Sequence, residues 1–196
     1  MPVRKGSALD PEATKAKVLT AASRLFYERG IHTVGVDEIA ERAGASKLSL
    51  YRYFRSKEGL VEAVVEERSA RIHEWLVEET AHAPPGRARV LALFDALLRW
   101  FADEGYHGCA VMNAATETRG QTSPVKAIAR THLRRYRQML VEQLTEAGVA
   151  DSEALAGQLL LLIEGASVVA VVEGPAVAGR DARRAAEALL DIVACD

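Results

Sequence analysis

The sequence has few cysteines and aromatic residues and no long uninterrupted apolar run. Two cysteines, Cys109 and Cys195, are too few for a disulfide framework or a zinc site. The longest apolar run, LLLLIEGASVVAVV, contains Glu164 and is shorter than the roughly 20 residues that span a membrane. The first residues, MPVRKGSALDPEATK, lack the apolar segment of a signal peptide. We therefore expect a cytoplasmic protein with free thiols and no membrane association.

Motifs for catalysis, cofactors and metals are also missing from the sequence. It has no glycine-rich phosphate loop, no metal-ligand spacing and no histidines grouped with paired carboxylates. His107 and Cys109 form the only nucleophile-like pair, and such close neighbours in sequence rarely make a working dyad. We therefore expect no enzyme activity, no cofactor and no metal, with a small helical enzyme as an alternative from another class.

The chain is expected to be all-α, because alanine and leucine dominate and no segment has the alternation of a strand. Glycine and proline divide it into about nine helical segments. Charge divides it in two: residues 1–60 carry 11 Lys+Arg against 7 Asp+Glu, and residues 61–196 carry 14 against 20. A basic amino-terminal module on an acidic body favours one orientation toward a polyanion. We expect two domains, a basic one over 1–56 with a flexible arm over 1–9, and an acidic one over 57–196.

Residues 47–56, KLSLYRYFRS, combine three basic residues with two tyrosines and contain no acid. At 100° per residue, Leu50 and Phe54 share one helical face and are expected to pack inward. The remaining surface offers the amine, guanidinium, hydroxyl and alkyl groups that read a DNA major groove. These candidate DNA-binding residues are Lys47, Leu48, Ser49, Tyr51, Arg52 and Tyr53. A solvated face, or a basic face that binds an acidic protein, is the alternative.

A helix-turn-helix is the structure that this segment and its neighbour predict. VDEIAERAG forms a short helix that ends at Gly44, and the residues from Lys47 form the second helix. Lys57 then lies in the first turn of the next helix. There its ammonium and the free backbone N–H groups can bind one phosphate together.

The motifs AASRLFYERG, VDEIAERAGAS and LYRYFRSKEGLVEAV resemble the amino-terminal signature of the tetracycline-repressor-like (TetR) transcriptional regulators. The resemblance implies a homodimeric repressor that binds a palindromic operator and is released by a small-molecule effector. It makes residues 1–56 the helix-turn-helix DNA-binding domain and residues 57–196 the ligand-binding and dimerisation domain. It places Lys47, Leu48 and Ser49 against bases, Tyr51 and Tyr53 against backbone or base edges, and Lys57 on a phosphate. The family often has glycine and threonine at the positions of Leu48 and Ser49, so we expect a different base preference that involves a thymine methyl.

The body is expected to hold the effector pocket between its long middle helices. Candidate apolar lining residues are Trp75, Phe94, Leu97, Phe101, Met112 and Met139, although side chains of these types at helical spacing are more often plain core. Asn113, Glu117 and Glu164 are polar groups in apolar surroundings, which need partners when buried. A ligand is one such partner, and a dimer contact or solvent is another.

The last two helical segments are the expected dimer interface. LAGQLLLLIEGASVVAVV has more apolar surface than one core can cover, and AAEALLDIV adds a matching stripe. In related regulators these two helices form a four-helix bundle with the partner subunit. A buried core helix in a monomer is the alternative.

Cys109 suggests a second form of regulation, the sensing of oxidants or electrophiles. It lies two residues after His107 at the expected start of a helix. Helix N-termini and imidazolium groups both lower the pKa of a thiol and favour the thiolate. An inert, partly buried thiol is the bland alternative.

Overall fold

The computed structural model describes residues 10–120 and 122–193, and over these residues it contains nine α-helices and no strand. The all-α prediction is therefore confirmed. The arm predicted over residues 1–9 and the thiol of Cys195 lie outside the described residues. The helices are α1 (Pro11–Arg29), α2 (Val36–Ala43), α3 (Lys47–Phe54), α4 (Lys57–Thr80), α5 (Arg87–Phe101), α6 (Ala110–Glu117), α7 (Pro124–Glu146), α8 (Ser152–Glu173) and α9 (Pro175–Val193).

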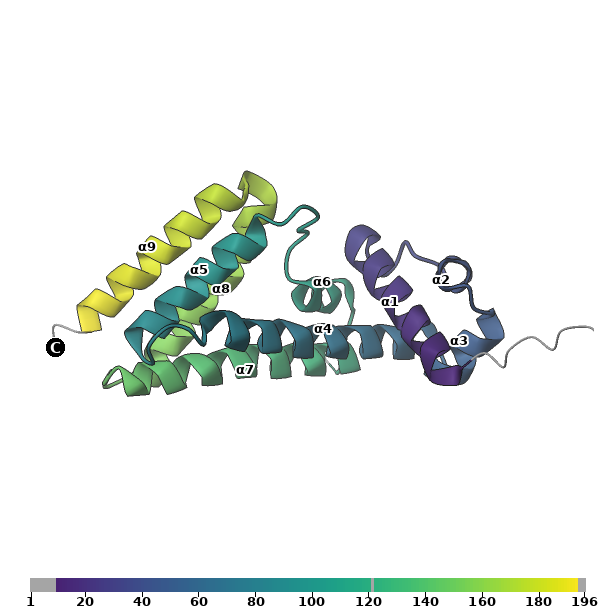
Figure 1. The fold of residues 1–196 in the computed structure, drawn as a ribbon, viewed down its shortest axis with the longest axis horizontal. Coiled ribbons are helices and arrows are strands. Elements are labelled where there is room, and N and C mark those ends of the chain that lie inside the picture. Colours follow the sequence, from purple (N-terminus) through teal and green to yellow (C-terminus); the bar gives the residue numbers. More distant parts are fainter. Residues whose placement is uncertain (1–9, 121, 194–196) are drawn as a thin grey trace, which may run out of the picture.

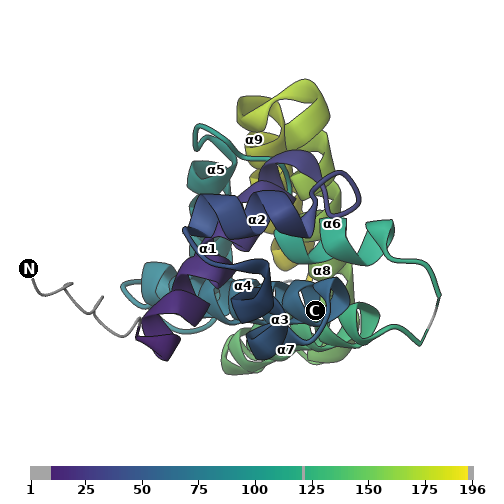
Figure 2. The same cartoon turned by 90° about the vertical axis from the view of Figure 1, so that its right-hand side faces the viewer.

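The molecule is elongated, with α1, α2 and α3 grouped at one end (Figure 1). Helix α4 leaves this group and runs along the body beside α7, while α5, α8 and α9 pack together at the far end. The short helix α6 lies between the two ends, against α4 and α7. Figure 2, turned by 90°, brings the α1–α3 group to the front of the body. A single long helix therefore connects the small module to the rest of the chain.

Local signals in the sequence set the helix ends near the small module. Asp10 precedes Pro11, and its carboxylate accepts a hydrogen bond from the backbone N–H of Glu12 at 3.0 Å. Gly44 ends α2 in the left-handed conformation at φ 61°, which glycine adopts without a steric penalty. Its own N–H bonds back to the last turn of α2. This glycine produces the sharp change of direction between α2 and α3.

Helix α8 is longer than its interrupted apolar run suggested. It is continuous through Glu164 over 22 residues, with a mean hydropathy of 2.1 in its most apolar window. By length and composition alone this helix could cross a membrane, so the prediction from the sequence that the apolar run is too short to span one was wrong. Packing against α7 and α9 buries one side of the helix, as in the core helix of a folded domain. The side left uncovered carries Leu161, Val168, Val169, Val171 and Val172.

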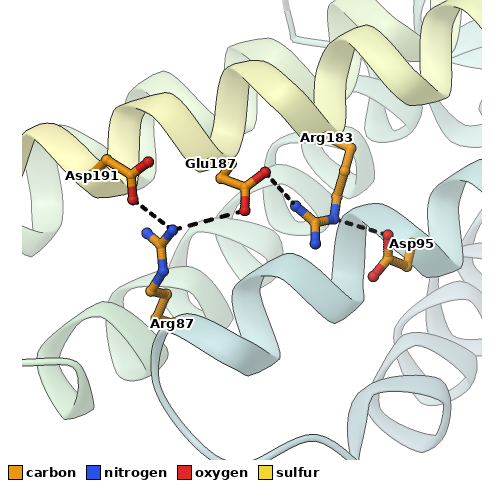
Figure 3. A network of polar contacts seen from close by, with 5 residues as sticks. All are labelled: Arg87, Asp95, Arg183, Glu187 and Asp191. Carbon is orange, nitrogen blue, oxygen red and sulfur yellow. Dashed lines mark hydrogen bonds and ion pairs between the residues drawn. The ribbon is translucent and has the colours of Figure 1, made fainter.

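Ion pairs join α9 to α5 at the far end of the body (Figure 3). Arg183 bonds to Asp95 at 2.9 Å and to Glu187 at 3.2 Å. Arg87 bonds to Asp191 at 2.6 Å and approaches Glu187 at 4.0 Å. Because these side chains are partly solvated, the network fixes the position of α9 more than it adds stability.

Candidate functional site

The inward face of α3 anchors the candidate DNA-binding surface. Leu50 is fully buried and Phe54 is 7% exposed, as the helical spacing predicted. Both pack in the core shared by α1, α2 and the first turns of α4. Ser46 caps the helix, since its hydroxyl oxygen accepts the backbone N–H of Ser49 at 3.0 Å. The orientation of α3 is therefore set by buried apolar contacts and by a cap.

The outward face of α3 projects into solvent. Leu48 is 80% exposed, which leaves its side chain free for a contact. Lys47, Tyr51 and Arg52 are also exposed. Ser49 and Tyr53 are partly buried on the flank, where the Tyr53 ring meets Phe54 edge-on at 6.4 Å between centroids. The predicted residues thus form one surface, with cationic, alkyl and hydroxyl groups at its centre.

The sequence analysis did not predict the acidic partner of Lys47 on α3. Asp37, in the first turn of α2, forms an ion pair with Lys47 at 2.8 Å. Both side chains are more than half exposed, so the pair adds little stability. It does hold the Lys47 ammonium in place and lowers the net positive charge of the surface. The spacing of ten residues across a turn gave no signal for this contact.

The turn between α3 and α4 brings Lys57 to the edge of the same surface. Lys57 is the first residue of α4, and Ser56 caps that helix through the backbone N–H of Gly59 at 3.1 Å. A Cβ atom at Gly59 would lie 2.3 Å from the carbonyl oxygen of Phe54, so no side chain fits there. Gly59 therefore allows the close approach that places Lys57 beside α3. The sequence analysis did not predict this role of Gly59, because the neighbouring residues 56–58 give no sign of a tertiary contact.

A seam joins the α1–α3 module to the body, formed by α1 and the turn after it on one side and by α6 and the loop before it on the other. The hydroxyl of Tyr27 donates to the carbonyl oxygen of Gly108 at 2.9 Å and accepts the backbone N–H of His107 at 2.9 Å. The Glu117 carboxylate accepts the backbone N–H of Ile31 at 2.8 Å. The Glu117 carbonyl lies 3.0 Å from Nε2 of His32. The seam is thus a hydrogen-bonded contact as well as an apolar one.

Two of the cavities next to α4 are lined by predicted ligand residues, three in all. The seam cavity, about 280 Å³, lies between α1, α4 and α6, and its walls include Asn113 and Glu117. A second cavity of about 420 Å³ lies between α4 and α5, where Trp75 and Trp100 stand 5.8 Å apart between ring centroids. Neither cavity is deep in the body. The places open to a small molecule are therefore at the surface of α4.

The other predicted ligand residues line neither cavity. Phe94, Leu97 and Phe101 are at most 3% exposed and belong to the hydrophobic core. Met112 and Met139 are partly buried against the same core. Plain packing, the alternative weighed for these apolar residues, accounts for their positions. A pocket among them does not match the geometry, because their side chains fill the space that a ligand would need.

Glu164 is partly buried on α8 and faces the interior of the body. Burial raises its pKa from 4.5 to about 7, because the charged carboxylate is poorly solvated there. Its charge raises the pKa values of Cys109, Tyr106 and Tyr136, which places it near α7 and the loop before α6. The sequence analysis singled out Glu164 as a polar group in apolar surroundings, and the structure shows it partly buried.

The environment of Cys109 contradicts the prediction of a low-pKa thiol. Cys109 does precede α6, but it is 6% exposed, and burial followed by the charge of Glu164 raises its pKa to about 12. His107 is exposed instead and packs edge-on against Tyr27. The histidine that meets the sulfur is His132, with Nε2 at 3.6 Å from Sγ. Burial also lowers the pKa of His132 to about 3, so its ring is neutral and provides no cation for a thiolate.

The architecture, a helix-turn-helix module joined by one long helix to an all-helical body, defines a class of transcriptional regulators. Residues 18–64 match the family described as "Bacterial regulatory proteins, tetR family". Residues 86–186 match "Tetracyclin repressor-like, C-terminal domain". The chain therefore belongs to the TetR family of transcriptional regulators, as its amino-terminal motifs suggested.

Relatives in this family include both activators and repressors. The transcriptional activator FasR of Mycolicibacterium smegmatis is 40% identical over 96 residues, which are 47% of this chain and 44% of FasR. The repressor NemR of Escherichia coli K12 is 31% identical over 106 residues, 53% of each chain. The chain thus matches about half the length of these curated relatives.

Solved structures of the family show the same fold over nearly the whole chain. SCO4454, a TetR-family regulator from Streptomyces coelicolor, superposes with a TM-score of 0.88 at 26% identity, covering 93% of this chain and 96% of its own. The reduced form of E. coli NemR superposes with a TM-score of 0.79 at 23% identity, covering 90% and 96%. The second likeness supports the fold alone.

Proposed function

We propose that the protein is a cytoplasmic, homodimeric and ligand-responsive transcriptional repressor, without catalytic activity, that binds a palindromic operator. The observation that carries this proposal is the outward face of α3. An exposed leucine, cations and hydroxyls lie there on a helix that is firmly anchored from behind. We place the boundary of the DNA-binding domain at residue 56, where α4 begins, and assign 57–196 to ligand binding and dimerisation.

In the proposed complex, α3 lies in the major groove. Leu48 contacts a thymine methyl, since an aliphatic side chain with this exposure matches that group. Lys47, Ser49 and Arg52 contact base edges or phosphates, and the tyrosine hydroxyls contact the backbone. Lys57 and the free N–H groups at the start of α4 bind one phosphate. The phosphate contacts fix the position, and Leu48 contributes sequence preference.

The proposed dimer forms through the uncovered side of α8 together with α9. Val177, at the start of α9, is exposed like the valines and the leucine on the uncovered side of α8. Such a stripe on a single protomer marks an interface, because monomeric proteins rarely expose so many neighbouring apolar side chains. A two-fold axis at this end would place both α3 helices on one duplex, and the operator would then be an inverted repeat.

Switching in this proposal works through α4 and the seam. Helix α4 contributes to both cavities and leads directly into the turn that follows α3. A ligand that binds more tightly to one position of α4 shifts the protein toward that position. The separation of the two α3 helices then changes, and the operator affinity changes by the same coupling free energy.

A salt titration of DNA binding tests this proposal. A TetR-type contact neutralises phosphates, so the logarithm of the binding constant should fall steeply and linearly with the logarithm of salt concentration. Lys57→Ala should reduce that slope by about 1. Lys126→Ala, in the first turn of α7, is the matched control and should leave the slope unchanged. Equal slopes for the wild type and Lys57→Ala would remove the phosphate contact from the proposal.

A further inference from the structure

Arg68 has an unusual environment for an arginine on a helix inside the fold. It lies on α4 and is partly buried at the seam. Its Nε donates to the hydroxyl of Ser23 at 2.9 Å, and its guanidinium carbon lies 4.7 Å from the centroid of the Tyr27 ring. Burial lowers the pKa of Arg68, which shows that the cation is poorly solvated. A hydroxyl and an aromatic face therefore hold this charge.

Two other arginines that lie between helices of the body are paired with carboxylates. Arg99 pairs with Glu79, and Arg183 pairs with Asp95 and Glu187. Arg68 has no carboxylate within ion-pair distance among residues 10–120 and 122–193. A partly buried guanidinium without an anion is costly, so this position favours an anion from outside the chain.

The two carboxylates in the wall of the seam cavity are already engaged. Glu28 pairs with Arg24 at 2.7 Å. Glu117 accepts the backbone N–H of Ile31. Neither is therefore placed to neutralise Arg68 without breaking a contact that the structure already has. The guanidinium also borders two neighbouring cavities, so it is reachable from solvent.

The remaining walls of the seam cavity determine what kind of anion fits. They combine polar side chains, among them Ser23, Asn113 and Thr116, with apolar side chains from α1, α4 and α6, namely Phe26, Val64, Val65, Ala110 and Ala114. A volume of about 280 Å³ admits a compact organic molecule and excludes a long acyl chain. One fork-shaped cation beside this apolar side of the cavity matches a carboxylate on a small apolar body.

We propose that the seam cavity binds a small organic monocarboxylate, whose carboxylate pairs with the guanidinium of Arg68 and whose apolar part lies against Phe26, Val64 and Ala110. The effector of the proposed regulator then belongs to this chemical class, and this regulatory part rests on the proposed function. The ligand contacts α1 of the DNA-binding module and both α4 and α6 of the body. Its binding is coupled to DNA binding wherever the seam differs between the two states.

Calorimetric titration of the whole protein, without DNA, tests the site itself. The probes are benzoate and hexanoate, with benzamide and hexanamide as neutral controls of matched shape. At least one acid should bind at least tenfold more tightly than its amide. Arg68→Gln should weaken that binding tenfold or more, whereas Arg71→Gln, an exposed arginine on the same helix that pairs with Glu67, should leave it unchanged. Gln keeps the polar contact with Ser23, which helps the variant to fold.

Ala110→Leu provides a second, independent test, since it fills the cavity and leaves the guanidinium in place. It should abolish acid binding, with a circular dichroism spectrum like that of the wild type. The site is overturned if neither acid binds better than its amide, or if the Arg68 and Arg71 variants lose binding equally.

DNA binding is measured separately, so that the two proposals can fail independently. The bound acid should change the operator affinity of the wild type by at least threefold and leave that of Arg68→Gln unchanged. An acid that binds through Arg68 without altering operator affinity refutes its role as effector. A protein that binds the acid and no duplex refutes the regulator proposal and leaves the site intact.

Discussion

Glu117 makes one of the hydrogen bonds that connect the body to the α1–α3 module, and Glu117→Ala should release it. In the structure its carboxylate accepts the Ile31 N–H at 2.8 Å, just beyond the end of α1. A hydrogen bond to a charged group contributes about 1.5–3 kcal/mol. Since about 1.4 kcal/mol is a factor of ten, the Ile31 amide should lose roughly 10- to 100-fold of its protection against hydrogen exchange.

Residue-resolved amide exchange of the wild type and the variant measures this effect. The Ser49 amide, which bonds to Ser46 in the same module and far from α6, is the internal reference and should keep its protection. Glu104→Ala, an exposed acid in the loop between α5 and α6, is the matched control and should change neither amide. Unchanged exchange at Ile31 would show that the seam contact does not hold the module. Equal loss at both amides would indicate general destabilisation instead.

Three further predictions concern the acid beside α3, the turn after it and the buried acid of α8. Asp37→Asn frees the ammonium of Lys47 and should tighten operator binding. It should also steepen the slope of the logarithm of the binding constant against that of salt concentration by about 1. Weaker binding would show that the main effect of Asp37 is to position Lys47 for the DNA contact. Gly59→Ala would place a Cβ 2.3 Å from a backbone oxygen and should lower the free energy of unfolding in urea by about 1–3 kcal/mol, whereas an unchanged midpoint would contradict the close approach. The pKa of Glu164 is about 7, above its ordinary 4.5. Between these two pH values the folded protein retains a proton that the unfolded chain has lost. The free energy of unfolding therefore declines as pH rises from about 4.5 to 7. The free energy of unfolding of Glu164→Gln, measured in urea at matched protein concentration, should therefore rise by up to ~3 kcal/mol relative to that of the wild type across this pH window. The exposed control Glu173→Gln should show no such rise. Parallel pH profiles of stability for Glu164→Gln and the wild type would contradict the burial of the carboxylate.

The helices and the outward face of α3 could be predicted because local sequence patterns determine them. Proline, glycine and capping residues mark the helix ends, and the spacing of Leu50 and Phe54 fixes which side of α3 faces outward. The same residues carry the family resemblance, and the family matches confirm it. Contacts between residues within a few helical turns of each other can thus be predicted from the sequence.

Contacts between distant segments could not be predicted in this way. Arg68 reads as one charge among many on α4, and its isolation depends on which side chains α1 and α6 bring near it. Cys109 was paired with His107 by proximity in sequence, whereas the fold buries it beside His132. A pKa depends on burial and on neighbours from other helices, so the local rule for a helix N-terminus gave the wrong direction.

The central claim is that the outward face of α3 reads a DNA groove in a two-fold assembly. Selection of bound duplexes from a randomised pool, with wild-type protein and Leu48→Ala in parallel, tests it most directly. The wild type should enrich an inverted repeat whose half-sites contain a defined thymine, and Leu48→Ala should relax the preference at that base without losing the repeat. No enrichment by the wild type, or an identical motif from both proteins with no half-site symmetry, would contradict the account.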